Sequence, residues 1–67
     1  MELNGDIRLE IARHKVTKYQ IAVELGIAQP TFSHWLNDRE LPEWKKTLVK
    51  EAIQNVARRK NGNSSNG

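Results

Sequence analysis

The chain has 67 residues, of which 11 are Lys or Arg and 8 are Asp or Glu, so its formal net charge is +3 at pH 7. This length supports one small domain, which has too little material to wall an enzyme's pocket, so a binding protein is the better hypothesis than an enzyme. The chain contains no cysteine and no long apolar run, which favours a cytoplasmic protein without a membrane partner, a disulfide or a thiolate metal site.

The first predicted helix covers about residues 5–14. Ile7 and Ile11 lie about one turn apart, so they share a face that can pack on a core. Asp6 stands in the first turn, where a negative charge interacts favourably with the helix dipole. His14, near the other end, has no carboxylate or thiolate pattern around it that would predict a metal site, and we expect it to be half buried.

A second helix is predicted over about residues 18–25. Thr17 precedes it and Gln20 follows three residues later, which is the pattern of a capping box, in which each side chain bonds to the backbone N–H of the other. Gly26 comes directly after the helix, at a position where a left-handed backbone ends a helix at little cost. The sequence therefore indicates both ends of this helix.

The third helix is predicted to begin at Gln29 or Pro30, because proline fits a helix only in its first turn. Phe32 and Leu36 share its inner face, and the helix is expected to end near residues 37–38, which are turn formers. So few residues separate it from the preceding helix that the two must cross steeply as a helix-turn-helix. Its opposite face presents polar or small uncharged side chains, namely Pro30, Ser33, His34 and Asn37.

A fourth and longer helix is predicted to open at Pro42 and to reach Arg58 or Lys60. Its apolar positions form a broad stripe of Trp44, Leu48, Val49, Ala52, Ile53 and Val56. Residues 61–67 contain only Asn, Gly and Ser and are expected to form a disordered tail. The predicted organisation is one helix-turn-helix domain over residues 1–60, followed by this tail.

The expected fold is all-α, a small bundle of about four helices with a long last helix. Its predicted core contains Ile7, Ile11, Ile21, Leu25, Ile27, Phe32, Trp35, Leu36, Leu48 and Ala52. Trp35 and Trp44 are expected to join the third helix to the fourth through this core rather than to stack on single-stranded nucleic acid. Val49 and Ile53, at the margin of the apolar stripe, are candidate contacts between two subunits.

The segment over residues 17–37 resembles the helix-turn-helix of the lambda repressor and Cro family. The resemblance is carried by Thr17, Ile21-Ala22, Leu25-Gly26-Ile27, Phe32-Ser33 and Trp35. It extends, less strongly, over about residues 5–45. The resemblance implies a DNA-binding protein whose third helix enters the major groove and which controls a nearby promoter.

The resemblance also implies which residues contact DNA. Its base-reading positions fall on Gln29, Pro30, Ser33 and His34, and its phosphate-contacting positions fall on Lys18, Asn37 and Arg39, to which we add Thr31. The sequence departs from the family pattern at Lys18, at Ala28 and at Pro30. Ala28 cannot cap the third helix, which costs some stability. Because Pro30 offers only van der Waals contact, Gln29 and His34 would carry more of the hydrogen-bonding readout.

Charge placement adds two further phosphate contacts. Residues 42–60 carry a net charge of +4, whereas residues 1–41 carry −1. Lys45 and Lys46 would flank DNA from the start of the fourth helix. The basic residues 58–60 would either touch the DNA backbone or favour the negative end of the helix dipole.

The resulting hypothesis is a sequence-specific regulator of transcription, such as a repressor, that binds double-stranded DNA as a homodimer on an inverted repeat. No catalytic residue, cofactor, metal or small-molecule substrate is expected. The small size is consistent with a phage or mobile-element origin. Two alternatives stay open: a protein-interaction module, and an architectural accessory factor that bends DNA for recombination. The sequence does not distinguish the last of these from a repressor.

Overall fold

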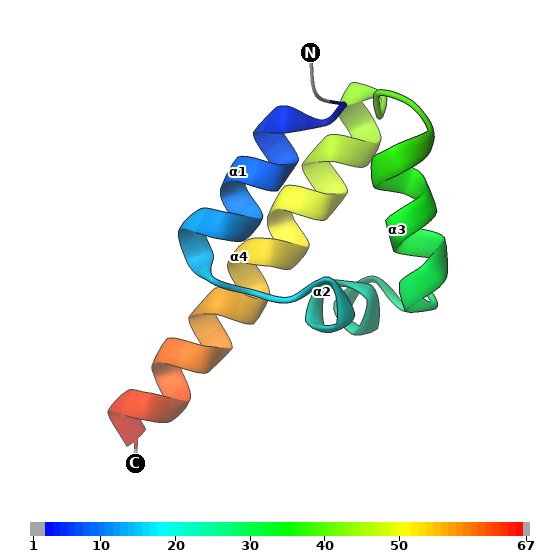
Figure 1. Ribbon diagram of the computed structural model, residues 1–67. Coiled ribbons are helices and arrows are strands. Elements are labelled where there is room, and N and C mark those ends of the chain that lie inside the picture. Colours follow the sequence, from blue (N-terminus) through cyan, green and yellow to red (C-terminus); the bar gives the residue numbers. More distant parts are fainter. Residues whose placement is uncertain (1–2, 67) are drawn as a thin grey trace.

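The computed structural model describes residues 3–66, with side chains for residues 3–60. Within that range the chain is all-helical, with four helices and no strand (Figure 1): α1 (Gly5–His14), α2 (Lys18–Leu25), α3 (Gln29–Asp38) and α4 (Glu43–Asn66). The prediction of a small all-α bundle is confirmed. The predicted tail, residues 61–67, lies outside the residues whose side chains are described, and no helix in the described range is long and apolar enough to cross a membrane.

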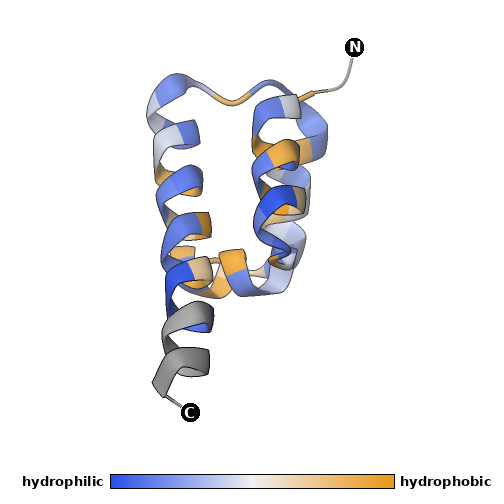
Figure 2. Cartoon of the chain, turned by 90° about the vertical axis from the view of Figure 1, so that its left-hand side faces the viewer, coloured by the Kyte–Doolittle hydropathy of each residue, from blue (hydrophilic) through white to orange (hydrophobic). Residues whose placement is uncertain are grey.

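The long helix α4 is the element on which the others are arranged. It packs against α1 and α2, and α2 in turn packs against α3. Helices α1 and α4 run in the same direction, α3 runs in the opposite direction, and α2 lies across the lower end (Figure 1). In the view turned by 90°, the loop from α3 to α4 joins the two sides of the molecule at the top (Figure 2). Helix α3 is therefore an outer element.

The predicted capping box of α2 is present. The backbone N–H of Gln20 donates to the hydroxyl of Thr17 at 3.0 Å, and the N–H of Thr17 donates to the Gln20 side-chain carbonyl, also at 3.0 Å. Gly26 ends the helix with a φ of 76°, a left-handed conformation that suits glycine. Ala28 precedes α3 without a side-chain cap, and Pro30 stands in the first turn of that helix, as expected.

The core joins all four helices. Its buried apolar residues are Ile7, Val16, Ile21, Ala22, Phe32, Leu36, Leu41, Val49, Ala52, Ile53 and Val56. Four other predicted core residues, Ile11, Leu25, Ile27 and Trp35, are partly buried against it. Trp35 packs edge-on to Phe32, with 6.4 Å between the ring centroids.

Helix α4 turns a different face inward from the one predicted. Leu48 is 44 % exposed and Trp44 is 63 % exposed, so the expectation that they lie in the core is wrong. Val49 and Ile53, which were expected to contact a second subunit, are instead fully buried within one chain. The predicted stripe is too broad for both of its edges to face one core, and packing against α1 and α2 selects the edge with Val49, Ile53 and Val56.

Candidate nucleic-acid interface

Helices α2 and α3 form a steeply crossed pair. Three residues, 26–28, separate them, and α2 is seen nearly end-on where α3 lies in the plane of the view (Figure 1). The pair is fixed from inside, since Ala22 of α2 and Phe32 and Leu36 of α3 are buried in the same cluster. This arrangement leaves the other side of α3 facing outward.

The outer side of α3 carries the predicted base-reading residues. Gln29, Pro30 and His34 are exposed and Ser33 is partly exposed, so none of them lies in the core. The His34 side chain is 73 % exposed, and its Nε2 lies 3.8 Å from a carboxylate oxygen of Asp38 one turn further along. The helix therefore offers an accessible amide, hydroxyl and imidazole along one face.

Basic residues follow the end of α3. Arg39 is 82 % exposed, and its Nε lies 3.4 Å from the Asp38 carboxylate. The ammonium of Lys45 lies 4.4 Å from the centre of the Trp35 ring and 5.3 Å from that of Trp44, so two aromatic faces hold it in place. A pocket of about 260 Å³ opens between these groups and is lined by His34, Trp35, Asp38, Arg39, Leu41, Pro42 and Lys45.

The remaining predicted phosphate contacts are spread over the same two helices. Lys18 is partly exposed at the first residue of α2, and Thr31 and Asn37 are exposed on α3. The side-chain carbonyl of Asn37 accepts a hydrogen bond of 2.7 Å from the Arg8 guanidinium. No contact with DNA follows from these positions alone, but all three side chains are accessible to it.

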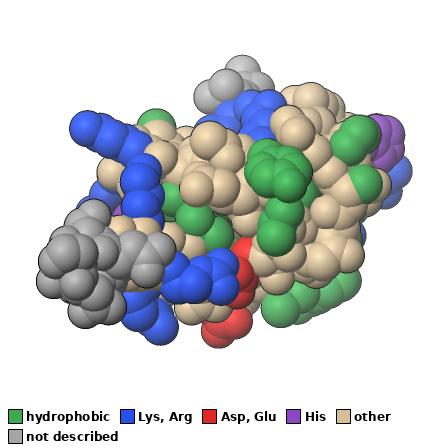
Figure 3. Space-filling view, turned by 90° about the horizontal axis from the view of Figure 1, so that it is seen from below, with side chains coloured by type: hydrophobic (Ala, Val, Ile, Leu, Met, Phe, Trp, Pro, Cys, Tyr) green, Lys and Arg blue, Asp and Glu red, His purple; other side chains and the backbone are tan. Residues whose placement is uncertain are grey.

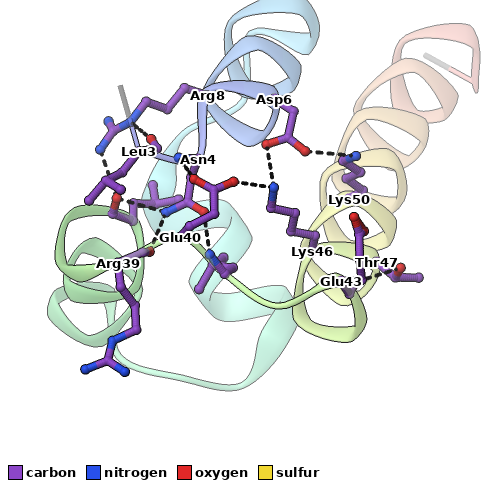
Figure 4. A network of polar contacts seen from close by, with 12 residues as sticks. Leu3, Asn4, Asp6, Arg8, Arg39, Glu40, Glu43, Lys46, Thr47 and Lys50 are labelled. Atoms are coloured by element: carbon purple, nitrogen blue, oxygen red, sulfur yellow. Dashed lines mark hydrogen bonds and ion pairs between the residues drawn. The ribbon is translucent and has the colours of Figure 1, made fainter. Parts of the chain in front are cut away.

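Lys46 differs from the other predicted phosphate contacts, because its side chain is only 12 % exposed. Its ammonium bonds to the Glu40 carboxylate and lies 3.4 Å from that of Asp6, which Lys50 also approaches at 3.2 Å (Figure 4). The bond to Glu40, and then that to Asp6, raises the pKa of Lys46 above its usual value. Lys46 thus joins the start of α4 to the start of α1 and to the loop between α3 and α4.

The same contacts lower the pKa values of both carboxyl groups. The bond from Lys46, followed by one from the Asn4 backbone, lowers the pKa of Glu40. Partial burial would raise the pKa of Asp6, but hydrogen bonds from Lys50 and Lys46 outweigh it, so that pKa is lowered as well. Carboxylates with lowered pKa values stabilise the fold above their ordinary pKa, and that stability is lost as the pH falls through the folded-state value.

This network predicts a pH-dependent effect of the substitution Lys46→Met. At pH 7 the variant is expected to melt at a lower temperature than the wild type, because Asp6 and Glu40 lose a shared cation. The gap should narrow as the pH falls below 4.5, the ordinary pKa of a glutamate, since both carboxyl groups then become protonated in the wild type too. Thermal melts followed by circular dichroism between pH 3 and pH 7 measure the gap, and a gap that is constant with pH would contradict the assignment.

Asn4 is a structural anchor of this region that the sequence did not indicate. It is the one buried polar residue among those described, and it precedes α1 in a left-handed conformation with a φ of 55°. Its Nδ2 donates to the backbone carbonyls of Leu36, at 3.0 Å, and of Arg39, at 2.9 Å, and lies 3.4 Å from that of Trp35. Its Oδ1 accepts the N–H of Leu41 at 2.8 Å. Asn4 lies outside α3 but provides hydrogen-bond partners for the backbone groups at the end of that helix and just after it.

A second surface lies on the other side of α2. Tyr19 and Val23 are among the most exposed large apolar residues, and with Val56 they line a groove of about 370 Å³ between α2 and α4. Gln20, Arg59 and Lys60 complete the lining. Seen from below, hydrophobic side chains are accessible beside a group of Lys and Arg side chains (Figure 3).

A search against family models, curated proteins and solved structures found no match to this chain. Within the described residues there is also no group of three or more His, Asp or Glu side chains placed to hold a metal ion. The assignment of function therefore depends on the geometry of α2 and α3.

Proposed function

We propose that the chain is a sequence-specific DNA-binding protein that regulates transcription, with α3 as the helix that enters the major groove. One observation carries the proposal: α3 is fixed to α2 by its buried side and presents an accessible, mostly uncharged face, which the exposed Arg39 follows at the end of the helix. A major groove about 12 Å wide admits an α-helix, and amide, hydroxyl and imidazole groups match the donors and acceptors of base edges. The lambda repressor and Cro family, which residues 17–37 resemble, docks in this way.

In the proposed complex, the first two turns of α3 read the bases. Gln29 stands at the amino end of the helix, where recognition helices reach deepest, and its amide can pair with an adenine edge. His34 lies five residues further along α3 and is also exposed. Ser33 and Pro30 keep this face shallow, so that the helix can approach the groove floor.

Phosphate contacts would fix the position of α3 on the duplex. Lys18 lies at the start of α2, and Arg39 and Lys45 follow the end of α3, so both helices of the pair carry or adjoin a cation that can meet a phosphate. Thr31 and Asn37 add neutral hydrogen-bond donors. Lys46 is left out of this set, because two carboxylates already engage its ammonium.

A homodimer on an inverted repeat remains part of the proposal, because one module of this size reads only a short half-site. The subunits cannot meet through Val49 and Ile53, which are fully buried in the core. Sedimentation of the free chain and of its DNA complex measures the stoichiometry directly. A monomer in both states would contradict the dimer without affecting the assignment of α3.

The proposal is tested by the double substitution Gln29→Ala, His34→Ala. A duplex selected from random-sequence oligonucleotides by the wild-type chain serves as the specific probe, and sheared genomic DNA serves as the nonspecific one. Because a good base contact contributes about 1–3 kcal/mol of discrimination, the double variant should bind the specific probe at least about tenfold more weakly and the nonspecific probe equally well. Titration by gel shift or fluorescence anisotropy gives both affinities.

Lys45→Ala is the matched control for charge. It should weaken binding to both probes by a similar factor and reduce the slope of log affinity against log salt by about 1. If the double variant at Gln29 and His34 binds like the wild type, α3 does not read bases.

A protein-interaction module is the second candidate, and the groove beside Tyr19 and Val23 favours it. Tyr19→Ala and Val23→Ala lie outside the proposed DNA face and should leave DNA affinity unchanged. Wild-type protein that retains no duplex from the random pool would contradict the DNA proposal and leave this second candidate.

A further inference from the structure

We propose that Arg8 is a positioning residue of the DNA interface, which holds the side-chain carbonyl of Asn37 so that the amide NH₂ is presented to a DNA phosphate. This inference rests on the proposed function, because it assigns a role to Arg8 only if α3 binds DNA. Arg8 lies on α1 and Asn37 lies in the last turn of α3, 29 residues further along the chain.

The guanidinium of Arg8 is held at several points. Its Nε donates to the carbonyl of Leu3 at 3.0 Å (Figure 4). Its Nη2 donates to the carbonyl of Leu36 at 3.2 Å and to Oδ1 of Asn37 at 2.7 Å. The rigid, planar fork of donors makes this geometry specific to arginine, because a lysine ammonium cannot reproduce its spacing. The position of the guanidinium is therefore set by the backbone of the two segments that it joins.

The contact determines which end of the Asn37 amide is available. An arginine side chain has only donors, so it can hold Asn37 only through the carbonyl oxygen. The other end of the amide, Nδ2, has no hydrogen-bond partner among the described residues, and the side chain is exposed. A phosphate oxygen needs a donor, and a freely rotating amide would present its carbonyl part of the time. Arg8 removes that alternative.

Asn37 also lies where such a donor is needed. It falls one turn after Ser33 and His34 on the same side of α3, at the end of the proposed base-reading face. The same turn is fixed by Asn4, whose Nδ2 bonds to the carbonyls of Leu36 and Arg39. The amide is thus oriented on a segment of backbone that is itself held in place, which is the condition for a precise contact.

A double-mutant cycle on the random-selected duplex tests the inference. Arg8→Lys keeps the charge but loses the fork, and Asn37→Ala removes the amide. Because a hydrogen bond to a charged group is stronger than one between neutral groups, Asn37→Ala should weaken binding about tenfold or more. Arg8→Lys should weaken it by a smaller factor, and should have no further effect in the Asn37→Ala background. Arg13→Lys, on the same helix and paired only with Glu10 among the described residues, is the control and should bind like the wild type.

Two further measurements separate positioning from a general loss of structure. Affinities are compared at a temperature at which circular dichroism shows every variant to be folded. The ¹⁵N order parameter of the Asn37 side chain, measured without DNA, should fall in Arg8→Lys. If Arg8→Lys does not fold, Asn37→Asp replaces it: this variant keeps an acceptor for Arg8 but removes the donor, so its affinity for DNA should fall below that of Asn37→Ala.

The outcomes are distinguishable. If Arg8→Lys weakens DNA binding in the wild-type background but not in the Asn37→Ala background, the inference is supported. If Arg8→Lys reduces DNA affinity equally in both backgrounds, or does not reduce it at all, the positioning role of Arg8 is overturned while the proposed function stands. Wild-type protein that retains no duplex overturns the proposed function and this inference together.

Discussion

Ile53→Ala is expected to lower the free energy of unfolding by about 3 kcal/mol, as is usual when a fully buried isoleucine is truncated and leaves a cavity. Ile53 has no exposed surface and lies in the cluster that joins α4 to the rest of the bundle. A chain of this size has a total stability of about 3–10 kcal/mol, so the variant should lose a large part of it. Thermal denaturation should show a midpoint lower by about 15 °C.

Leu48→Ala is the matched control for this prediction. Leu48 lies on the same helix but is 44 % exposed, so its truncation should cost less than about 1 kcal/mol. Both variants should be measured in urea at two protein concentrations that differ tenfold. A cost for Ile53→Ala that changes with protein concentration, or a larger cost for Leu48→Ala, would contradict the burial of Ile53 within one chain and restore it as a subunit contact.

The sequence predicted both ends of α2 and the start of α3 well, because local residues set them, whereas α4 continues to Asn66 rather than ending at Arg58 or Lys60. Thr17 and Gln20 cap α2 within one turn, and Gly26 ends that helix through its own backbone conformation. The turn that follows, and Pro30 in the first turn of α3, depend equally on neighbours in the chain. Each of these helix ends depends only on residues within about four positions along the chain, so it can be predicted from the sequence without knowing how the helices pack.

The inward face of α4 was predicted less well, because it depends on packing between distant segments. Six apolar residues of that helix cover too wide an arc for all of them to be buried. Which edge of α4 turns inward depends on where α1 and α2 lie, and those positions depend on contacts between distant parts of the chain. The ring of the exposed Trp44 lies beside the Lys45 ammonium rather than in the core.

The candidate site also has one part that could be predicted from neighbouring residues and another that depends on distant contacts. The outer face of α3 could be predicted, because Phe32 and Leu36 identify the inner face of that helix and so define the opposite one. The roles of Asn4 and Arg8 could not be predicted, since their partners on and after α3 lie 28–37 residues away. No pattern around Asn4 distinguishes a residue that caps its own helix from one that anchors another.

Asn4→Ala is expected to destabilise the chain by about 3–4 kcal/mol, from two separate causes. The left-handed backbone at residue 4 costs a residue other than Gly or Asn about 1 kcal/mol. The truncation also leaves the carbonyls of Leu36 and Arg39 and the N–H of Leu41 without their partner, and an unsatisfied buried group costs about 1–3 kcal/mol. Chemical denaturation at pH 7 measures the total.

Two other substitutions at residue 4 separate these causes. Asn4→Gly suits the left-handed backbone, so it should recover about 1 kcal/mol relative to Asn4→Ala and no more. Asn4→Asp keeps the size and the acceptor for Leu41, but it places a negative charge against the carbonyls at the end of α3, where the helix dipole is also negative. It should therefore be the least stable of the three at pH 7 and gain stability as the pH falls, because the protonated carboxyl group can donate. An Asn4→Asp variant as stable as the wild type at pH 7 would show that residue 4 does not hold the end of α3 through its amide donors.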